Sequence, residues 1–243
     1  MPFALGRWSY ETPVMSVIRR LVPEGGRVLE VGCGSGALAS LLSHYGFDVV
    51  GLDDDPDIVA CAQEIASQLN APARIAQGSA FDLSNYYDRF DLVYSLGVLE
   101  HFDAPVTVKL LEEQARCAAY VMIVVPSRFT KYSGPITDER IYNRRQVAAL
   151  VRQAGLKPLS SFVYGSIPTT VSRAMDLLLP RAVNDIVRHL CTYAMGICCI
   201  GSRPDADECR QKRLRAKQGS ELLYNESASP RQKSSSLPNR LPE

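Results

Sequence analysis

Long hydrophobic runs are missing from this chain. None of its 243 residues belongs to an apolar stretch of the roughly 20 residues that a membrane-spanning helix requires. Residues 1–10 also lack the apolar core of a secretory signal. We therefore expect a cytoplasmic protein without a transmembrane segment. Hydrophobic residues make up 46% and charged residues 22% of the chain, which is the composition of an ordinary globular protein.

Regular cysteine spacing is absent as well. The seven cysteines are an odd number and form no Cys-x-x-Cys pair, so the chain predicts neither a disulfide framework nor a common zinc site. Five candidate metal ligands lie in the last third of the chain: His189, Cys191, Cys198, Cys199 and Cys209. Because two of these cysteines are adjacent in an apolar run, we interpret the thiols as buried and expect no metal. Three further cysteines fall in helix and strand patterns, where we expect small apolar side chains: Cys33, Cys61 and Cys117.

A strong net charge of either sign is missing. The formal net charge is +1, but residues 203–243 hold nine Lys/Arg against six Asp/Glu, so the preceding body is slightly acidic. Phosphate contacts need a clustered basic face, and a nucleic acid is therefore disfavoured as a partner. We interpret residues 203–243 as a flexible, solvated tail, because they have too little apolar content to offset the entropy of ordering. The basic cluster 210–217 is the part of this tail that RNA or an anionic lipid would contact.

The chain does contain a strand, a glycine turn and a second strand that ends in acid. The apolar run 27–31 is short and β-branched, as is typical of a strand that is covered on both faces. The glycines of the turn 32–36 let the backbone turn sharply and approach a ligand closely. Asp53, at the end of the second strand, can accept hydrogen bonds from both hydroxyls of a ribose. This order predicts a nucleoside-binding crevice.

Two classes of cofactor fit this crevice. The pattern Gly32-x-Gly34-x-x-Ala37 also matches the relaxed dinucleotide fingerprint, which predicts an NAD-dependent oxidoreductase. Glu30 argues against NAD, because a carboxylate at the end of the first strand would repel a pyrophosphate. The same carboxylate suits a ligand that carries an ammonium and a sulfonium. Gly36 is also one position early for the dinucleotide pattern, so S-adenosylmethionine fits better.

Four motifs of the chain resemble those of class I S-adenosylmethionine-dependent methyltransferases, and in particular their small-molecule, type 11-like branch. They follow the order of that family over roughly residues 15–165: Val28–Gly36, Val50–Ile58, Gly78–Leu83 and Phe90–Phe102. The resemblance implies an α/β fold with a Rossmann-like, doubly wound, seven-stranded and mostly parallel sheet that has an antiparallel edge strand. It also implies the cofactor S-adenosyl-L-methionine.

The resemblance carries cofactor roles onto individual residues. Glu30 is expected to bind the methionine ammonium, Asp53 the ribose hydroxyls, and Asp54 to lie beside the adenine edge. Where the family often has an acid for the adenine amino group, this chain has Ser79, so its hydroxyl and the amide of Ala80 take that place. The expected cofactor-binding residues are Glu30, Gly32, Cys33, Gly34, Gly36, Asp53, Asp54, Ser79, Ala80 and Leu96. Both acids also have a structural interpretation, Glu30 near the start of the first helix and Asp53 as the cap of the helix opened by Pro56.

The methyl acceptor is marked less clearly. Neither the Asn/Asp-Pro-Pro-aromatic motif of amide methylases nor the Pro-Cys nucleophile of cytosine methylases is present. Both absences favour a small-molecule or lipid acceptor that is methylated on oxygen or nitrogen. An RNA methyltransferase that uses the basic tail, and a binding protein that has lost methyl transfer, are the remaining alternatives.

One histidine and four aromatic residues are candidates for the acceptor site. Histidine as a residue type suits proton transfer near neutral pH, which makes His101 a candidate general base, although it also fits a structural role between the fourth strand and its helix. Trp8 and Tyr10 are candidates for a lid, and Tyr132 and Tyr142 for the lining of the acceptor site.

Alternating hydrophobic periodicities predict the elements of an α/β domain over residues 1–202. The expected helices are 12–21, 35–45, 56–69, 104–116 and 143–154, and the expected strands are 27–31, 47–52, 73–77, 90–95, 119–125, 156–164 and 195–200. Residues 166–192 are expected to form a helical insertion, in which Pro180 separates two short amphipathic helices. These helices either pack on the sheet or form a cap over the acceptor pocket, a dimer interface or a surface for peripheral lipid contact.

Overall fold

The computed structural model describes residues 13–129, 140–165, 167, 169–191, 193–208 and 211. The chain divides into two compact units, Met1–Ala206 and Asp207–Glu243. The candidate residues Trp8, Tyr10, Tyr132 and Cys209 lie outside the described residues, as does almost all of the second unit. The predicted boundary between residues 202 and 203 therefore stays a prediction.

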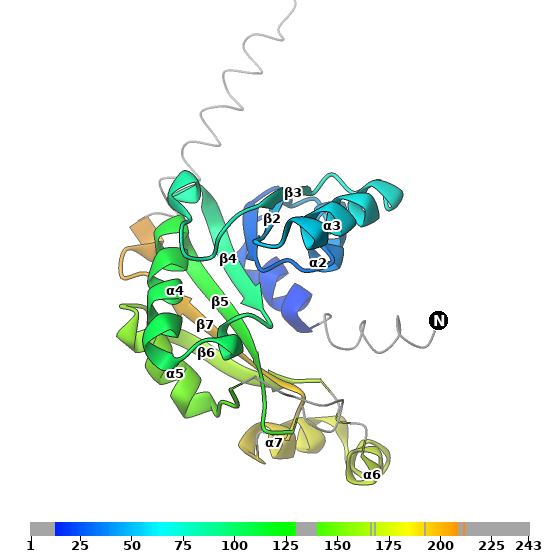
Figure 1. Ribbon diagram of the computed structural model, residues 1–243. Helices are drawn as coiled ribbons and strands as arrows, with labels where there is room; N and C mark the ends of the chain where they lie inside the picture. The colour runs from blue at the N-terminus through cyan, green and yellow to red at the C-terminus, as the bar shows by residue number, and fades with distance from the viewer. Residues whose placement is uncertain are drawn as a thin grey trace, which may run out of the picture. The chain divides into compact units, whose positions relative to one another are not determined.

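Seven strands form one sheet in the order β3-β2-β1-β4-β5-β7-β6 (Figure 1). The strands are β1 (Arg27–Val31), β2 (Asp48–Asp53), β3 (Arg74–Gln77), β4 (Phe90–Leu96), β5 (Ala118–Pro126), β6 (Lys157–Tyr164) and β7 (Gly196–Ser202). The first five strands are parallel, whereas β7 is antiparallel to both of its neighbours, β5 and β6. This confirms the predicted Rossmann-like, mostly parallel sheet with one antiparallel strand toward its edge. That strand is β7, and β6 lies outside it as the outermost strand.

The helices follow the strands in the predicted alternation. They are α2 (Ala37–His44), α3 (Pro56–Gln68), α4 (Ala104–Cys117), α5 (Arg144–Gln153), α6 (Thr170–Leu178), α7 (Arg181–Cys191), the single turns η1 (Ser84–Tyr86) and η2 (Leu99–His101), and a helix over residues 13–21. α2 begins two residues later than expected, because its N-cap Gly36 adopts a left-handed conformation with φ of 66°. α3 begins as predicted, with Pro56 in its first turn.

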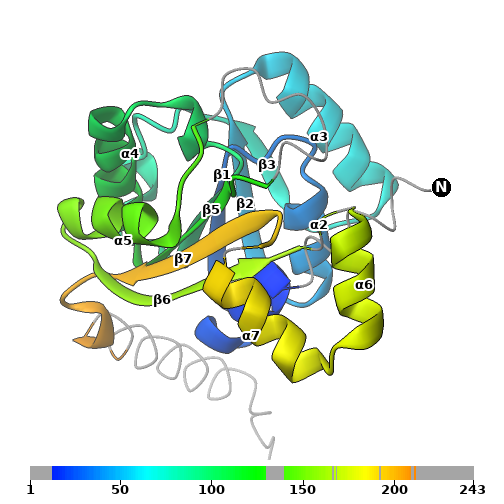
Figure 2. The ribbon, with the colours of Figure 1, turned by 90° about the horizontal axis from the view of Figure 1, so that it is seen from below.

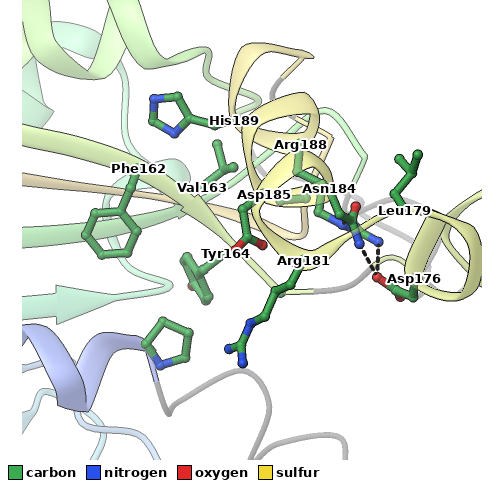
Figure 3. Close-up of a pocket in the computed structure, with 13 residues that line it drawn as sticks. Phe162, Val163, Tyr164, Asp176, Leu179, Arg181, Asn184, Asp185, Arg188 and His189 are labelled. Atoms are coloured by element: carbon green, nitrogen blue, oxygen red, sulfur yellow. Dashed lines mark hydrogen bonds and ion pairs between the residues drawn. The ribbon is translucent and has the colours of Figure 1, made fainter.

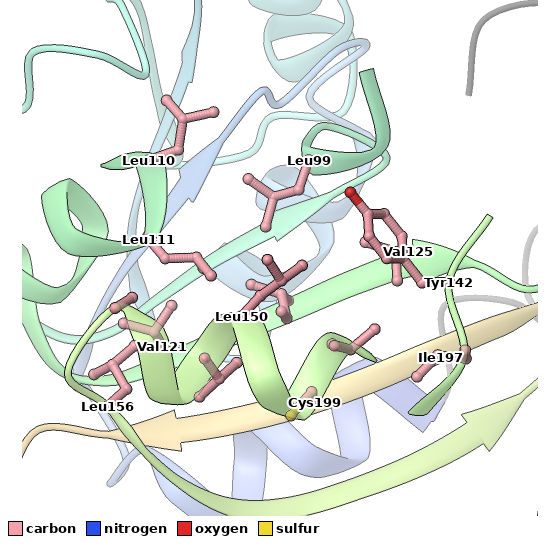
Figure 4. Close-up of a cluster of buried hydrophobic side chains, with 14 residues drawn as sticks. Leu99, Leu110, Leu111, Val121, Val125, Tyr142, Leu150, Leu156, Ile197 and Cys199 are labelled. Atoms are coloured by element: carbon pink, nitrogen blue, oxygen red, sulfur yellow. The ribbon is translucent and has the colours of Figure 1, made fainter. Parts of the chain in front are cut away.

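The helices cover the two faces of the sheet in pairs. α2 and α3 lie on one face and α4 and α5 on the other (Figures 1 and 2). This follows from right-handed crossovers, since the chain moves from β1 outward to β3 and then from β4 outward in the opposite direction. One core cluster fills the space between α4, α5 and strands β5 and β7 (Figure 4). It includes Leu111, Val121, Leu150, Ile197 and Cys199.

The cysteines divide into two groups. Four are buried free thiols, as predicted: Cys33, Cys117, Cys198 and Cys199. The expectation was wrong for Cys61 and Cys191, which are exposed. Cys61 lies off the stripe of buried α3 residues, Val59, Ala62 and Ala66, and Cys191 is the last residue of α7. Helical position, rather than membership of a helix, decides the exposure of each thiol.

The topology places a switch point at the carboxyl edge of the sheet. β1 lies between β2 and β4, and the strand order reverses there. The connections that leave β1 and β4 therefore lead to opposite faces of the sheet. In open α/β sheets this switch point is where ligands bind. The glycine turn 32–36 lies at this point.

Candidate active site

The glycine turn is fixed to the end of the neighbouring strand. The amides of Gly32 and Cys33 both donate to the carbonyl of Leu52, each across 2.8 Å. Gly32, Gly34 and Gly36 have φ angles of 74°, 51° and 66°, in the left-handed region that other residues enter at a cost. The turn requires a left-handed conformation at three of its five positions, and this explains why the sequence has glycine at each of them.

Two of these glycines differ in their surroundings. A Cβ on Gly32 would lie 2.3 Å from Cγ2 of Val98, so this glycine leaves room for the loop after β4. A Cβ on Gly34 would meet no heavy atom within 4 Å. Gly32 is therefore required by packing inside the protein, whereas Gly34 borders open space at the switch point.

Asp53, at the end of β2, contacts the glycine turn. Its Oδ2 accepts a hydrogen bond from the amide of Gly34 across 2.9 Å, and its Oδ1 accepts one from the amide of Asp55 across 3.3 Å. The N-cap of α3 is Asp55, whose Oδ1 accepts from the amides of Asp57 and Ile58. The structural interpretation of Asp53 as the cap of this helix is therefore wrong. Asp53 instead joins the end of β2 to the glycine turn.

Glu30 lies on β1 next to the turn and is only 4% exposed. Its strand neighbours are Gly51 on β2 and Tyr94 on β4. The N-cap of α2 is Gly36, and no side chain forms a cap hydrogen bond there. The structure thus does not support a capping role for Glu30.

Gly51 is a residue whose importance sequence reasoning missed. A Cβ at this position would lie 3.0 Å from Cβ of Cys33, so a larger residue would displace the turn. The sequence did contain a sign of this role, because a glycine inside a predicted strand often marks a place where another part of the backbone comes close. Gly51 also keeps the space beside Glu30 free of a side chain.

Cys33 lies within reach of both carboxylates. Burial raises the pKa of its thiol to about 12, and the negative charges of Glu30 and Asp53 add to this effect. The thiol is therefore neutral at physiological pH. Since both carboxylates act on the same sulfur, the two acids that the sequence singled out are brought to one place.

The loop after β3 carries the residues that are predicted to lie at the adenine side of the site. The amide of Gly78 donates to the carbonyl of Asp53 across 2.9 Å, so this loop is joined to the end of β2. The hydroxyl of Ser79 accepts a hydrogen bond from the amide of Phe81 across 3.2 Å. Asp54 is exposed, and Ala80 is half-buried.

An aromatic pair next to this loop was not foreseen. Phe81 is 56% exposed, and its ring packs edge to face against Phe102 with centroids 5.5 Å apart. Phe102 follows η2, so the pair joins the loop after β3 to the loop after β4. The sequence could have pointed to this pair, because Phe81 lies within the motif Gly78–Leu83 and no role was predicted for it.

His101 is exposed on the turn η2, just after β4. Its neighbour Glu100 is buried, and the carbonyl of Glu100 accepts a hydrogen bond from the amide of Arg140 across 2.8 Å. Leu96, at the end of β4, is half-buried. The structure therefore places His101 at the carboxyl edge of the sheet, in the same loop as Val98.

Tyr142 belongs to the core more than to an open site. It is 9% exposed, and it packs in the cluster with Leu99 and Val125 (Figure 4). Its backbone pairs with Ser127 beyond the end of β5. Its predicted role at the acceptor site stays a prediction.

A cavity of about 700 Å³ lies at the carboxyl end of β6, between this strand and the helices α6 and α7 (Figure 3). Phe162, Val163 and Tyr164 of β6 line one side, and Pro13 contributes at another. Because β6 is parallel to β5, this end of β6 lies at the same edge of the sheet as the glycine turn. The two predicted helices separated at Pro180 are confirmed, and their inner faces line this cavity.

A buried arginine joins α6 to α7 beside the cavity. Arg188 is 8% exposed, and its guanidinium donates to Asp176 across 3.0 Å and to the hydroxyl of Ser172 across 2.7 Å. It also donates to Oδ1 of Asn184 across 2.9 Å. A hydrogen-bonded buried arginine of this kind holds the two helices in one arrangement.

His189 lies next to this arginine in α7. The pKa of its imidazole is lowered, mainly by burial and further by the positive charge of Arg144.

Within the described part of the chain, no group of three or more His, Cys, Asp or Glu residues is arranged to hold a metal ion. Within the same residues, no helix combines the length and apolar character needed to cross a bilayer.

Comparison with known proteins agrees with this geometry. A family model described as "Methyltransferase domain" matches residues 28–119, which include the glycine turn, Asp53 and His101. The ubiquinone biosynthesis O-methyltransferase of Azorhizobium caulinodans is 38% identical over 78 residues, or 32% of this chain and 31% of that protein. The enzyme of the same name from Cereibacter sphaeroides is 28% identical over 159 residues, or 56% of this chain and 62% of that protein. The chain thus spans less than two thirds of the length of these relatives.

A solved structure shows the same fold. Magnesium protoporphyrin IX methyltransferase (ChlM) from Synechocystis PCC 6803 with bound SAH superposes with a TM-score of 0.60 at 16% identity, covering 82% of this chain and 84% of that one. Residues 28–119 thus match the family model of a methyltransferase domain, and the described residues have the fold of a solved methyltransferase.

Proposed function

We propose that this protein is an S-adenosylmethionine-dependent methyltransferase that methylates an oxygen or nitrogen of a small-molecule or lipid acceptor. One observation carries the proposal: Gly34 borders open space at the switch point of the sheet, and the adjacent Cys33 lies within reach of the two acids Glu30 and Asp53. Methyl transfer from a sulfonium is an in-line displacement, in which positive charge leaves the sulfur as the acceptor attacks. The protein therefore contributes mainly position and orientation.

The residues around this space fit the proposed cofactor. A carboxylate has about four acceptor positions, and two amides use only two of those on Asp53. The others remain for the two ribose hydroxyls. Glu30 supplies negative charge for the methionine ammonium, and the absent side chain of Gly34 lets the ligand approach the backbone.

The remaining cofactor contacts are proposed on the same basis. Ser79 uses its oxygen to accept from Phe81, and its own O–H stays available to the adenine ring. The amide of Ala80 and the carboxylate of Asp54 lie in the adjoining loops. Leu96, the last residue of β4, is proposed to line the position of the methyl group.

We propose the cavity beside α6 and α7 as the acceptor site. Its aromatic wall, with Phe162 and Tyr164, suits a flat organic acceptor. The O-methyltransferase names of the relatives support a hydroxyl acceptor. For such an acceptor, His101 is proposed as the general base that removes the hydroxyl proton.

The relatives and the solved structure reported above support neither of the two alternative enzymes, the NAD-dependent oxidoreductase and the RNA methyltransferase. Calorimetry separates the cofactor classes directly: we expect heat of binding with S-adenosylmethionine and its demethylated product, and none with NAD. Tight binding of NAD alone would refute the proposal.

The acceptor is identified by tracing a label. The purified protein is incubated with methyl-labelled S-adenosylmethionine and a metabolite extract, and we expect label in a small organic molecule. Label in RNA would support the RNA alternative, and cofactor binding with no transfer to any fraction would support a binding protein. The cytoplasmic location stays a prediction, which cell fractionation tests.

A further inference from the structure

The helices α6 and α7 have their polarity reversed relative to a helix that packs on a core. The residues they bury are polar: Ser172 of α6, and Asn184 and Arg188 of α7. Helices of globular proteins normally bury their apolar stripe. Here the hydrogen bonds of Arg188 hold the polar stripe inside.

The apolar stripes of both helices consequently face outward. Leu177, Leu178 and Leu190 are 83%, 75% and 76% exposed, and three further apolar residues of this surface are exposed as well: Val171, Val183 and Ile186. We call these six residues the outer apolar face. A contiguous exposed apolar surface usually marks a site of interaction.

A basic groove adjoins this face. A cavity of about 790 Å³ between α5, β6 and α7 is lined by Arg144, Arg145 and Arg152, together with Leu190 of the outer apolar face. Residues 140–157 contain five Lys/Arg and no Asp/Glu. The arginines therefore border Leu190 without intervening acids on α5.

Two arginines also contact the end of α7. Arg144 donates to the carbonyl of His189 across 3.3 Å, and Arg128 donates to the carbonyl of Cys191 across 3.4 Å. Cations at a helix C-terminus are stabilised by its negative end. Positive charge is thus held at the boundary between the polar body and the outer apolar face.

We propose that the outer apolar face and the basic groove together dock this protein onto an anionic lipid surface. Leucines beside arginines are the pattern of a helix that lies in a membrane interface, with its apolar side in the acyl boundary and its cations at the headgroups. Charge complementarity favours an anionic lipid surface over a second copy of this chain. A second copy of this face would bring the arginines of both copies together, whereas anionic headgroups neutralise them. The inference goes beyond methyl transfer and does not depend on it.

The chain supplies a matched pair of reporter positions. Cys191, at the end of α7, and Cys61, on α3, are both exposed, whereas burial raises the pKa of Cys33 to about 12 and of Cys199 to about 11. An environment-sensitive fluorophore is attached at Cys191 in the full chain with Cys61→Ser and Cys209→Ser. The control carries it at Cys61, with Cys191→Ser and Cys209→Ser.

Vesicles of phosphatidylglycerol mixed with phosphatidylcholine are compared with vesicles of phosphatidylcholine alone. We expect a blue shift of the fluorophore at Cys191 with the anionic vesicles only, and no shift at Cys61 with either. Co-sedimentation measures the affinity in parallel.

Substitutions then separate the two parts of the surface. The triple variant Leu177→Gln, Leu178→Gln, Leu190→Gln should lose the blue shift and bind anionic vesicles at least tenfold more weakly, because glutamine keeps the helices but removes their apolar side chains. Leu69→Gln, at a half-exposed leucine beside α3, is its control. Arg145→Gln with Arg152→Gln should weaken binding about fivefold per arginine, whereas Arg20→Gln with Arg89→Gln should not.

The proposal fails if neither kind of vesicle is bound, if both are bound equally, or if the leucine variant binds like the wild type. The last result would assign binding to another part of the chain, such as the basic tail. It also fails if light scattering shows a dimer that the leucine variant abolishes and no vesicle is bound. Circular dichroism confirms that each variant is folded.

Discussion

The amide of Gly34 donates a hydrogen bond to Oδ2 of Asp53 across 2.9 Å. This bond joins the turn after β1 to the end of β2 and fixes the distance between the two sides of the proposed cofactor site. Asp53 is thus both a structural link and the proposed ribose ligand. Variants of this site have to separate these two roles.

Asp53→Ala should weaken S-adenosylmethionine binding about tenfold to a hundredfold, because a charged hydrogen bond contributes roughly 1.5–3 kcal/mol. The overall fold should persist, since the strand pairing of β1 with β2 does not involve this side chain. Calorimetry measures the affinity and circular dichroism the fold. Wild-type affinity in this variant would refute the ribose assignment, and Asp57→Ala, at an exposed position in α3, is the control.

Glu30→Gln should discriminate between two parts of the ligand. We expect weaker binding of S-adenosylmethionine and unchanged binding of methylthioadenosine, which has the nucleoside but lacks the methionine ammonium. Asp53→Ala should weaken both, because both ligands carry the ribose. Equal losses for the two ligands in Glu30→Gln would contradict the assignment of Glu30 to the ammonium.

The two glycines of the turn should respond differently to alanine. Gly32→Ala adds left-handed strain and a contact of 2.3 Å with Val98, so it should lower the free energy of unfolding by roughly 2–4 kcal/mol. Gly34→Ala adds only the strain, about 1–2 kcal/mol, but places a methyl group in the open space and should abolish cofactor binding. Urea unfolding and calorimetry measure both effects. Undiminished cofactor affinity in Gly34→Ala would show that the ligand does not occupy this space.

Asp55→Ala tests the corrected cap of α3. Loss of the two hydrogen bonds to the amides of Asp57 and Ile58 should cost about 1 kcal/mol of stability in urea unfolding. Cofactor affinity should change little, because the proposed ribose ligand is Asp53. A loss of affinity as large as that of Asp53→Ala would mean that the two aspartates act as one unit.

His101→Ala should lower kcat about a hundredfold or more if His101 is the general base, and it should leave cofactor affinity unchanged. The side chain is exposed, so stability should also be unaffected. Single-turnover kinetics with the identified acceptor measure this change. Unaltered turnover would return His101 to a structural role.

Much of the fold was predictable because it depends on local patterns. The parallel strands are short, apolar and bounded by turn residues, and the carboxyl ends of β1 and β2 carry the acids that define the site. The separation of α6 from α7 at Pro180 follows from the loss of a backbone donor and the clash that proline causes in a helix. These features need only residues that are close in sequence.

The role of each acid required the tertiary structure. Asp53 and Asp55 are both acids near the start of α3, and only the hydrogen bonds show that Asp55 is the cap and that Asp53 contacts Gly34. Gly51 and Val98 likewise act on the turn from other strands and loops. No local pattern reports a contact between residues so far apart in the chain.

The sequence by itself determined that α6 and α7 each have an apolar stripe, because helical spacing is a local property. It did not determine which side of these helices faces the protein. That was decided by the hydrogen bonds of Arg188 to Ser172 and Asp176, which join residues on two different helices and bury the polar stripe. A buried charge must be paired, and the partners that make its burial possible are assembled only when the chain has folded.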